Sequence, residues 1–186
     1  MKDFPKDLIV GKYQLKLLPA SISLAQEVFD IYNTDVAAMF FWVPNGLPKR
    51  VEEVLLEMVE NETNEKSCMY YVYENKKLLG QVGFSNIGWK HGVGSIGYWL
   101  RKEARGKGVV SYVLPEIERL GFEDLNMRKL IINCAGDNMP SRKVAERHGY
   151  KLDAVCRQDV VYPDGSIHDN CEYSKLKSEW EKGKQK

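Results

Sequence analysis

The chain has 186 residues, which favours a single domain over residues 1–186 that is long enough to bury a substantial core. It carries 27 lysines and arginines against 26 aspartates and glutamates, so its net charge of +1 indicates neither nucleic acid nor an anionic membrane as a partner. The N-terminal stretch MKDFPKDLIVGKY has proline and charges where a signal peptide has an apolar block. The chain also lacks the run of about 18 apolar residues that predicts a membrane span, and we expect a cytoplasmic protein.

The cysteines and histidines are scattered and form neither a CxxC pair nor a metal-ligand spacing. They are Cys68, Cys134, Cys156 and Cys171, with His91, His148 and His168. We therefore expect no metal and no disulfide framework. Each cysteine is expected in or beside the core as a small apolar residue.

The N-terminal third predicts one strand and two helices. Residues 13–18 resemble a strand, and Ser23 to Gln26 resembles the capping box of a first helix. Pro48 is well placed to begin the second helix. The apolar stripes of the two helices comprise Leu24, Val28, Ile31 and Tyr32, and then Val51, Val54, Leu55, Met58 and Val59.

The rest of the chain alternates strands with two helices. Strands are predicted at residues 68–73, 78–87, 95–100, 129–135, 152–161 and 167–176, with helices at 109–122 and from about 138 to 148. Gly149 should end the second of these helices, and Pro115 should kink the first or delay its start. The last ten residues are polar and are expected to fray. The order predicts an α+β fold with a mixed, mostly antiparallel seven-stranded sheet and flanking helices.

The junction RKEARGKGVV (residues 101–110) joins a predicted strand to a predicted helix and is rich in glycine and basic residues. Glycine lets the backbone approach a ligand closely, and the unpaired N–H groups of a first helical turn bind anions such as phosphate. The pattern lacks the GxxxxGK[ST] of a P-loop. It also lies after antiparallel strands, unlike a dinucleotide-binding fingerprint. A plain tight turn remains an alternative.

Three segments in this order resemble the GNAT N-acetyltransferases, and more narrowly their RimL/RimJ-type branch, over most of the chain. They are YWLRKEARGKGVV, GDNMPSRKVAERHGY and DGSIHDNCEYSKLKSEW. The family signature R/Q-x-x-G-x-G/A corresponds to Glu103 through Gly108, and Glu103 departs from it at a position that varies in this branch. The resemblance implies a splayed central strand, acetyl-CoA as co-substrate and direct transfer of the acetyl group to an amine, without a metal or a nucleophilic cysteine.

The resemblance also implies which residues bind the cofactor. Backbone N–H groups from Arg105 to Val109, which include Gly106, Lys107 and Gly108, would cradle the pyrophosphate. Arg105 and Lys107 would add charge at the rim or stay solvated. Leu100 and Arg101 would lie beside the pantetheine arm, and a backbone N–H near Leu100 would stabilise the oxyanion.

On the short second helix, Asn138 matches the pantetheine-binding asparagine and also fits a helix N-cap. Ser141 would protonate the leaving thiolate, or would only satisfy the helix start. Lys143 and Arg147 are solvated charges or phosphate contacts. Asp159 and His168 are the candidates for a general base, although an ordinary surface position is the favoured interpretation of each.

The acceptor is expected to be the N-terminus of a ribosomal or other protein. A small amine such as a polyamine, amino sugar or amino acid, and a non-catalytic acyl-CoA-binding module, are the alternatives. Phe40, Phe41 and Trp42 either fill the core or form a wall of the acceptor groove. We expect a monomer or a homodimer.

Overall fold

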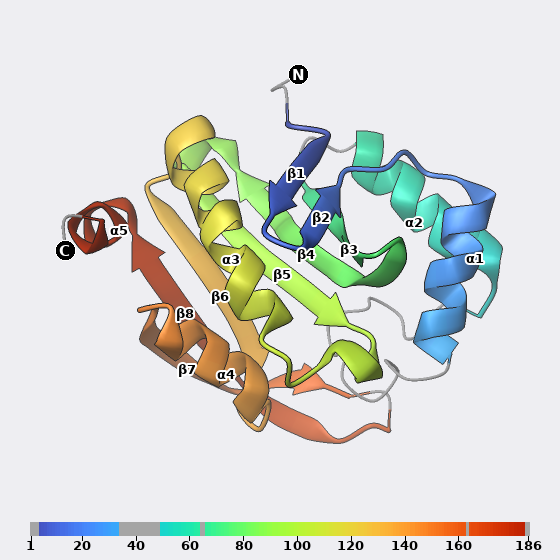
Figure 1. Ribbon diagram of the computed structural model, residues 1–186. Helices are drawn as coiled ribbons and strands as arrows, with labels where there is room; N and C mark the ends of the chain where they lie inside the picture. The colour runs from blue at the N-terminus through green and yellow to red at the C-terminus, as the bar shows by residue number, and fades with distance from the viewer. Residues whose placement is uncertain (1–3, 34–48, 64–65, 163, 185–186) are drawn as a thin grey trace.

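The computed structural model describes residues 4–33, 49–63, 66–162 and 164–184, and only the backbone of residues 61–63. An eight-stranded mixed sheet, in the order β1-β2-β3-β4-β5-β6-β8-β7, forms its frame (Figure 1). The strands are β1 (Asp7–Val10), β2 (Tyr13–Lys16), β3 (Cys68–Glu74), β4 (Lys77–Gly88), β5 (Val93–Leu100), β6 (Lys129–Ala135), β7 (Lys151–Val161) and β8 (Ile167–Leu176). The α+β fold class is confirmed, but the count of seven strands was one short.

The missing strand, β1, pairs with β2 in a hairpin that places Leu8 opposite Leu15. β1 has only four residues, and its side chains alternate between exposed and half-buried. So short a segment at a sheet edge carries little hydrophobic pattern, and for this reason it escapes sequence analysis.

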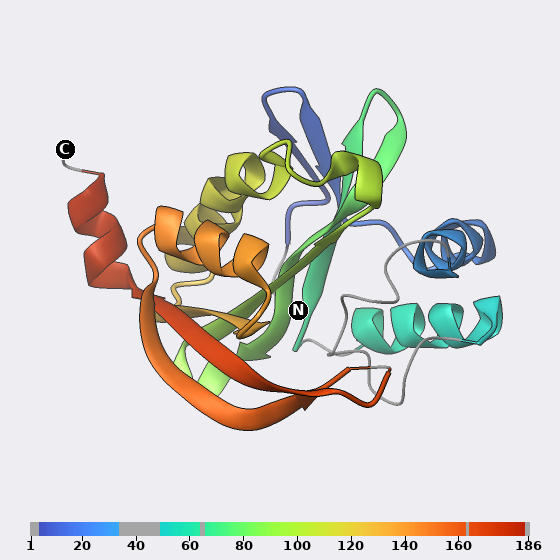
Figure 2. The ribbon, with the colours of Figure 1, turned by 90° about the horizontal axis from the view of Figure 1, so that it is seen from below.

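Helices cover both faces of the sheet. Figure 2 shows α1 (Ile22–Ile31) and α2 (Val51–Thr63) on one side of β5, and α3 (Val109–Arg119) and α4 (Met139–Arg147) on the other. The larger core cluster packs α3 against the central strands, and a second one packs α1 and α2 against Tyr71, Leu78 and Trp99. Within the described part of the chain, no helix is long and apolar enough to cross a membrane.

The helix boundaries correct three expectations. The N-cap of α1 is Ser21, not Ser23, because Ser21 has an extended backbone and its hydroxyl accepts the Leu24 N–H at 3.3 Å. α3 begins at Val109 despite the internal Pro115, so its start is not delayed. It ends at Arg119 rather than Phe122, because a π-helical turn, η4 (Leu120–Asp124), follows it.

The C-terminal segment does not fray within the described residues, because it forms α5 (Lys177–Gly183). The Glu179 carboxylate accepts the Leu176 N–H at 3.0 Å, which caps the helix. Trp180 packs against Phe122 with ring centroids 5.2 Å apart. A single aromatic side chain therefore attaches an otherwise polar helix to the core.

Three of the four cysteines are buried as expected, but Cys156 is exposed. It lies on β7, an edge strand whose side chains are nearly all exposed. A buried ion pair joins the sheet to α3: Lys175 on β8 donates to Glu118 at 2.8 Å.

Candidate active site

The sheet opens between its two parallel strands. β5 and β6 pair only where Val93 to Ser95 faces Lys129 to Ile131, at one end of both strands. Beyond Ser95, β5 stays paired with β4 as far as Leu100, whereas β6 pairs with β8. This divergence confirms the splayed central strand, and it creates a gap between β5 and β6.

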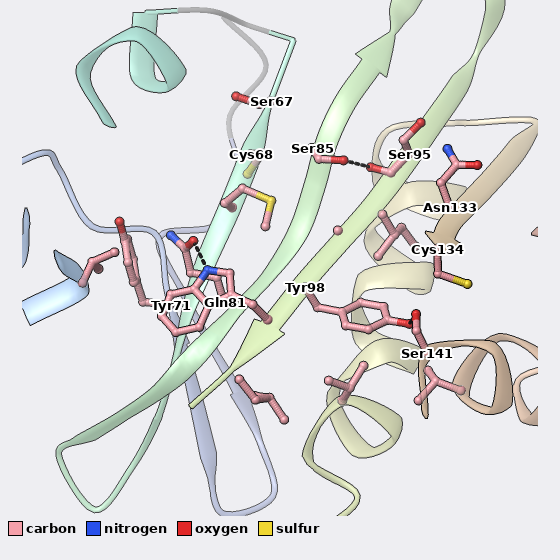
Figure 3. A pocket seen from close by; sticks show the side chains of 18 of the residues that line it. Ser67, Cys68, Tyr71, Gln81, Ser85, Ser95, Tyr98, Asn133, Cys134 and Ser141 are labelled. Atoms are coloured by element: carbon pink, nitrogen blue, oxygen red, sulfur yellow. Dashed lines mark hydrogen bonds between the residues drawn. The ribbon is translucent and has the colours of Figure 1, made fainter. Parts of the chain in front are cut away.

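A cavity of about 1660 Å³ runs along this gap and is lined by residues from both faces of the sheet (Figure 3). A pocket for one drug-sized ligand typically has about 300–1,000 Å³. The cavity is therefore large enough for two reactants that meet in the gap.

The glycine loop forms one end of the cavity. Gly106 and Gly108 line it, and both have left-handed backbones, with φ of +70° and +74°. A Cβ built on either glycine would meet no atom within 4 Å, so both face open space. Gly108 is also the N-cap of α3, whose first N–H groups have no partner within the helix. The loop thus presents backbone donors to an empty space of the kind that an anion fills.

Basic side chains surround this end of the cavity. Arg105, Lys143 and Arg147 line it, and Arg147 also donates to the Ser111 hydroxyl at 3.3 Å. The Arg105 Nε donates to the Leu100 carbonyl at 2.9 Å, which ties the loop to the end of β5. The electrostatic potential at the start of α3 therefore favours an anionic group.

Three of the residues expected at the cofactor do not line the cavity with their side chains. Lys107 is exposed, and Val109 is buried in the core, so Val109 can contribute only its backbone. The guanidinium of Arg101 forms an ion pair with Glu103, with 3.4 Å between Nη1 and Oε1. The backbone N–H of Arg101 donates to the Leu79 carbonyl of β4.

The backbone of Leu100 faces the gap. The Arg101 N–H donates to the Leu79 carbonyl of β4. In an antiparallel pair, the N–H groups of successive residues point alternately toward the partner strand and away from it, so the N–H of Leu100 points away from β4. The N–H of Tyr98 points the same way. These donors lie along the free edge of β5, where an extended ligand can pair with the strand.

Asn138 and Ser141 lie on the other side of the gap, at the start of α4. The Asn138 side chain accepts the Ser141 N–H at 3.2 Å, so Asn138 is the helix N-cap. The Ser141 hydroxyl lies 2.8 Å from the Tyr98 hydroxyl, which reaches across from β5 (Figure 3). Ser141 is therefore not occupied with the helix start, because its hydroxyl bridges the gap.

Tyr98 is the member of this pair that sequence analysis missed. Burial raises the pKa of its phenol, although the bond to Ser141 acts in the opposite direction. Tyr98 therefore stays protonated and can donate to the Ser141 oxygen. With Tyr98 as the donor, Ser141 can give its own proton to another group, such as the Cys134 sulfur or a ligand in the cavity. The sequence offered one signal for Tyr98: side chains alternate along a strand, so Tyr98 and its neighbour Trp99 lie on opposite faces of the sheet.

Two of the buried cysteines also line the cavity. Burial raises the pKa of Cys134 to about 11 and that of Cys68 to about 12. Both are thiols at neutral pH. Because the thiolate is the nucleophile, neither cysteine is activated for covalent catalysis.

The two base candidates lie outside the cavity lining. Asp159 accepts a hydrogen bond from Asn170 at 3.0 Å. The Nε2 of His168 lies 2.8 Å from the Ser166 hydroxyl, and its Nδ1 lies 3.1 Å from the Asp137 carboxylate. This arrangement resembles a catalytic triad. However, the Ser166 hydroxyl already donates its proton to the Asp164 carboxylate at 2.6 Å. This network holds the β7–β8 hairpin together and does not activate Ser166.

No group of three or more histidine, cysteine, aspartate or glutamate side chains among the described residues could hold a metal ion. Phe40, Phe41 and Trp42 lie outside the described residues.

Comparison with known proteins identifies the family. Residues 14–151 match the family model described as "Acetyltransferase (GNAT) domain", and the chain belongs to this family. Over 104 residues it is 36% identical to "Putative ribosomal N-acetyltransferase YdaF" of Bacillus subtilis (strain 168), with 56% of each chain covered. It is 29% identical over 90 residues to the ribosomal-protein-serine acetyltransferase of Escherichia coli (strain K12), with 48% of this chain and 50% of that protein covered. The chain thus spans about half the length of these two relatives.

A solved structure supports the fold. This is RimL, a ribosomal L7/L12 alpha-N-protein acetyltransferase, in complex with coenzyme A that forms a disulfide with a cysteine of that protein. It superposes with a TM-score of 0.79 at 22% identity, with 91% of this chain and 97% of that chain covered.

Proposed function

We propose that the protein transfers an acetyl group from acetyl-CoA directly to a primary amine, and that the acceptor is the N-terminus of a ribosomal or other protein. The observation that carries the proposal is the gap between β5 and β6, with the glycine loop at one end and the Tyr98–Ser141 bridge across it. Membership of the GNAT family and the coenzyme A complex of RimL support acetyl-CoA as the co-substrate. The names of the relatives support the acceptor class.

The pyrophosphate binds at the start of α3, on the N–H groups from Gly106 to Val109, because the Arg105 N–H already donates to the Lys102 carbonyl at 3.1 Å. Gly106 and Gly108 allow its approach, and Arg105 and Lys143 neutralise its charge. The pantetheine arm then runs along the free edge of β5 past Leu100. The side-chain amide of Asn138 remains available to it as a donor.

The reaction is a direct displacement. The amine nitrogen attacks the thioester carbonyl carbon, and the N–H of Leu100 stabilises the oxyanion. When the C–S bond breaks, Ser141 donates its proton to the leaving thiolate while the Tyr98 hydroxyl donates a hydrogen bond to the Ser141 oxygen. The proton that the attacking nitrogen loses returns to Ser141 through water, so that a neutral amine and a thioester give an amide and a free thiol. The high pKa of Cys134 agrees with a mechanism that needs no acetyl-cysteine. A ribosomal acceptor also fits the cytoplasmic location expected from the sequence.

A thiol-release assay tests the proposal. The purified protein is incubated with acetyl-CoA and a panel of peptide N-termini, polyamines, amino sugars and amino acids. We expect release of free coenzyme A with the peptides and no competition by NAD or ATP at matched concentration. Binding of acetyl-CoA without release on any amine would contradict the proposal and indicate a non-catalytic acyl-CoA-binding module.

A further inference from the structure

The cavity has two halves of different character. The glycine loop, α3 and α4 lie on one face of β5 (Figure 2), and they contribute Arg105, Lys143 and Arg147 to what we call the coenzyme half. On the opposite face, α1, α2 and β3 contribute Val28, Tyr32, Val54, Glu57, Met58 and Tyr71. Glu57 is the only acidic side chain among the described residues that line the cavity, whose cations are Lys6, Arg105, Lys143 and Arg147.

Glu57 has the surroundings of a charge-binding group. It lies half-buried on α2, and no described residue forms an ion pair or a hydrogen bond with its carboxylate. Burial raises its pKa, and the nearby Glu60 adds to the effect, so its charge is poorly compensated within the described structure. A cation that enters this half of the cavity would relieve that cost.

The walls beside Glu57 suit the same kind of ligand. Tyr32 lines the same part of the cavity, where burial raises the pKa of its phenol and the charge of Glu57 adds to the effect. Tyr32 packs against Trp99 with ring centroids 5.6 Å apart, and Tyr71 lines the same side of the cavity. Aromatic faces attract cations, and together with one carboxylate they form a typical environment for an ammonium group.

We infer that Glu57 binds the positive charge of the incoming amine and is the specificity-determining residue of the acceptor half. The inference rests on the proposed function, because an amine acceptor reaches the enzyme largely as an ammonium ion. A single carboxylate compensates a single positive charge. The acceptor half therefore fits an amine whose only charge in this region is on the reacting nitrogen, such as a peptide N-terminus, better than a polyamine, which carries further charges.

The test compares Glu57→Gln with the wild type on the best peptide acceptor of the panel. Loss of a charged hydrogen-bonding group should raise the KM for the peptide about 10- to 100-fold. The KM and Kd for acetyl-CoA should stay unchanged, because the coenzyme binds in the other half. Glu52→Gln is the matched control, since Glu52 lies exposed on the same helix outside the cavity lining and loses the same charge.

The possible results of this test distinguish a failure of the inference about Glu57 from a failure of the proposed function. If the wild type acetylates the peptide and Glu57→Gln has the same peptide KM as Glu52→Gln, the inference is wrong and the proposed function stands. If the wild type acetylates a polyamine with higher kcat/KM than every peptide, the single-charge specificity is wrong. If the wild type acetylates no amine, the proposed function fails and the inference fails with it.

Discussion

At the residue scale, the proposed chemistry depends on the hydrogen bond between Tyr98 and Ser141. The sequence could identify Ser141 because it lies three positions after Asn138 in a recognisable segment. It could not identify Tyr98, because strand alternation predicts the face on which a side chain lies but not what it reaches. The 2.8 Å separation of the two hydroxyls depends on how β5 and α4 are placed across the gap.

Replacing Ser141 with alanine should lower turnover roughly 10- to 100-fold, near the low end of general-acid contributions, because a coenzyme A thiol is already a tolerable leaving group. Tyr98→Phe should lower it about 3- to 10-fold, since it removes only the hydrogen bond to Ser141. Acetyl-CoA affinity, measured by calorimetry, should change little in either variant. Tyr112→Phe, which removes a hydroxyl from an exposed tyrosine of α3, serves as the control.

The pH dependence gives a second readout for this pair. Because the pKa of Tyr98 is raised, its phenol should stay protonated at pH values around 10, where an ordinary tyrosine ionises. The wild type should therefore show no loss of turnover at these pH values from ionisation of Tyr98.

If Ser141→Ala turned over like the wild type, Ser141 would have no part in the mechanism. Positioning and backbone electrostatics would then account for the catalysis.

At the element scale, the junction of the glycine loop and α3 is the proposed anchor of the coenzyme. Gly108→Val should raise the Kd for acetyl-CoA about 10- to 100-fold, because the new side chain projects into the space that the pyrophosphate needs. Calorimetry on the folded variant measures this change.

Gly165→Val is the control for backbone strain. Gly165 also has a left-handed backbone, with φ of +84°, and a Cβ built on it meets nothing within 4 Å, but it does not line the cavity. Both variants should lose comparable stability, whereas only Gly108→Val should lose affinity. An equal Kd in the two variants would remove the loop from the binding site.

Most elements could be predicted because their periodicity is strong. β3 and β4 have long apolar runs because both faces of the sheet are covered, and the apolar stripe of α3 comes from burial on one face. β1 and α5 could not be predicted, because β1 is too short to show a pattern and α5 is held by contacts with distant residues. These are Trp180 with Phe122, Glu179 with Lys151 and Lys184 with Glu123. Local sequence carries no information about a contact that the tertiary fold supplies.

At the scale of the whole molecule, the arrangement of the strands could not be derived from their order. The splay between β5 and β6 was expected only from the resemblance to the GNAT family, since the short parallel pairing of Val93 with Lys129 leaves no mark in either strand. Glu57 was missed for the same reason: the fold brings α2 to the cavity from a distant part of the chain. The extent of the domain over residues 1–186 and the oligomeric state stay predictions.

The most direct test of the account is to find where the acetyl group goes. The protein is incubated with acetyl-CoA and a peptide that has a free N-terminus, and mass spectrometry is applied to the peptide and to the intact enzyme. We predict a peptide acetylated at its α-amine, an equal amount of free coenzyme A and no acetyl group on the enzyme, because Cys134 remains a thiol. An acetyl group held on Cys134, or bound acetyl-CoA with no amine acetylated, would contradict direct transfer in the gap between β5 and β6.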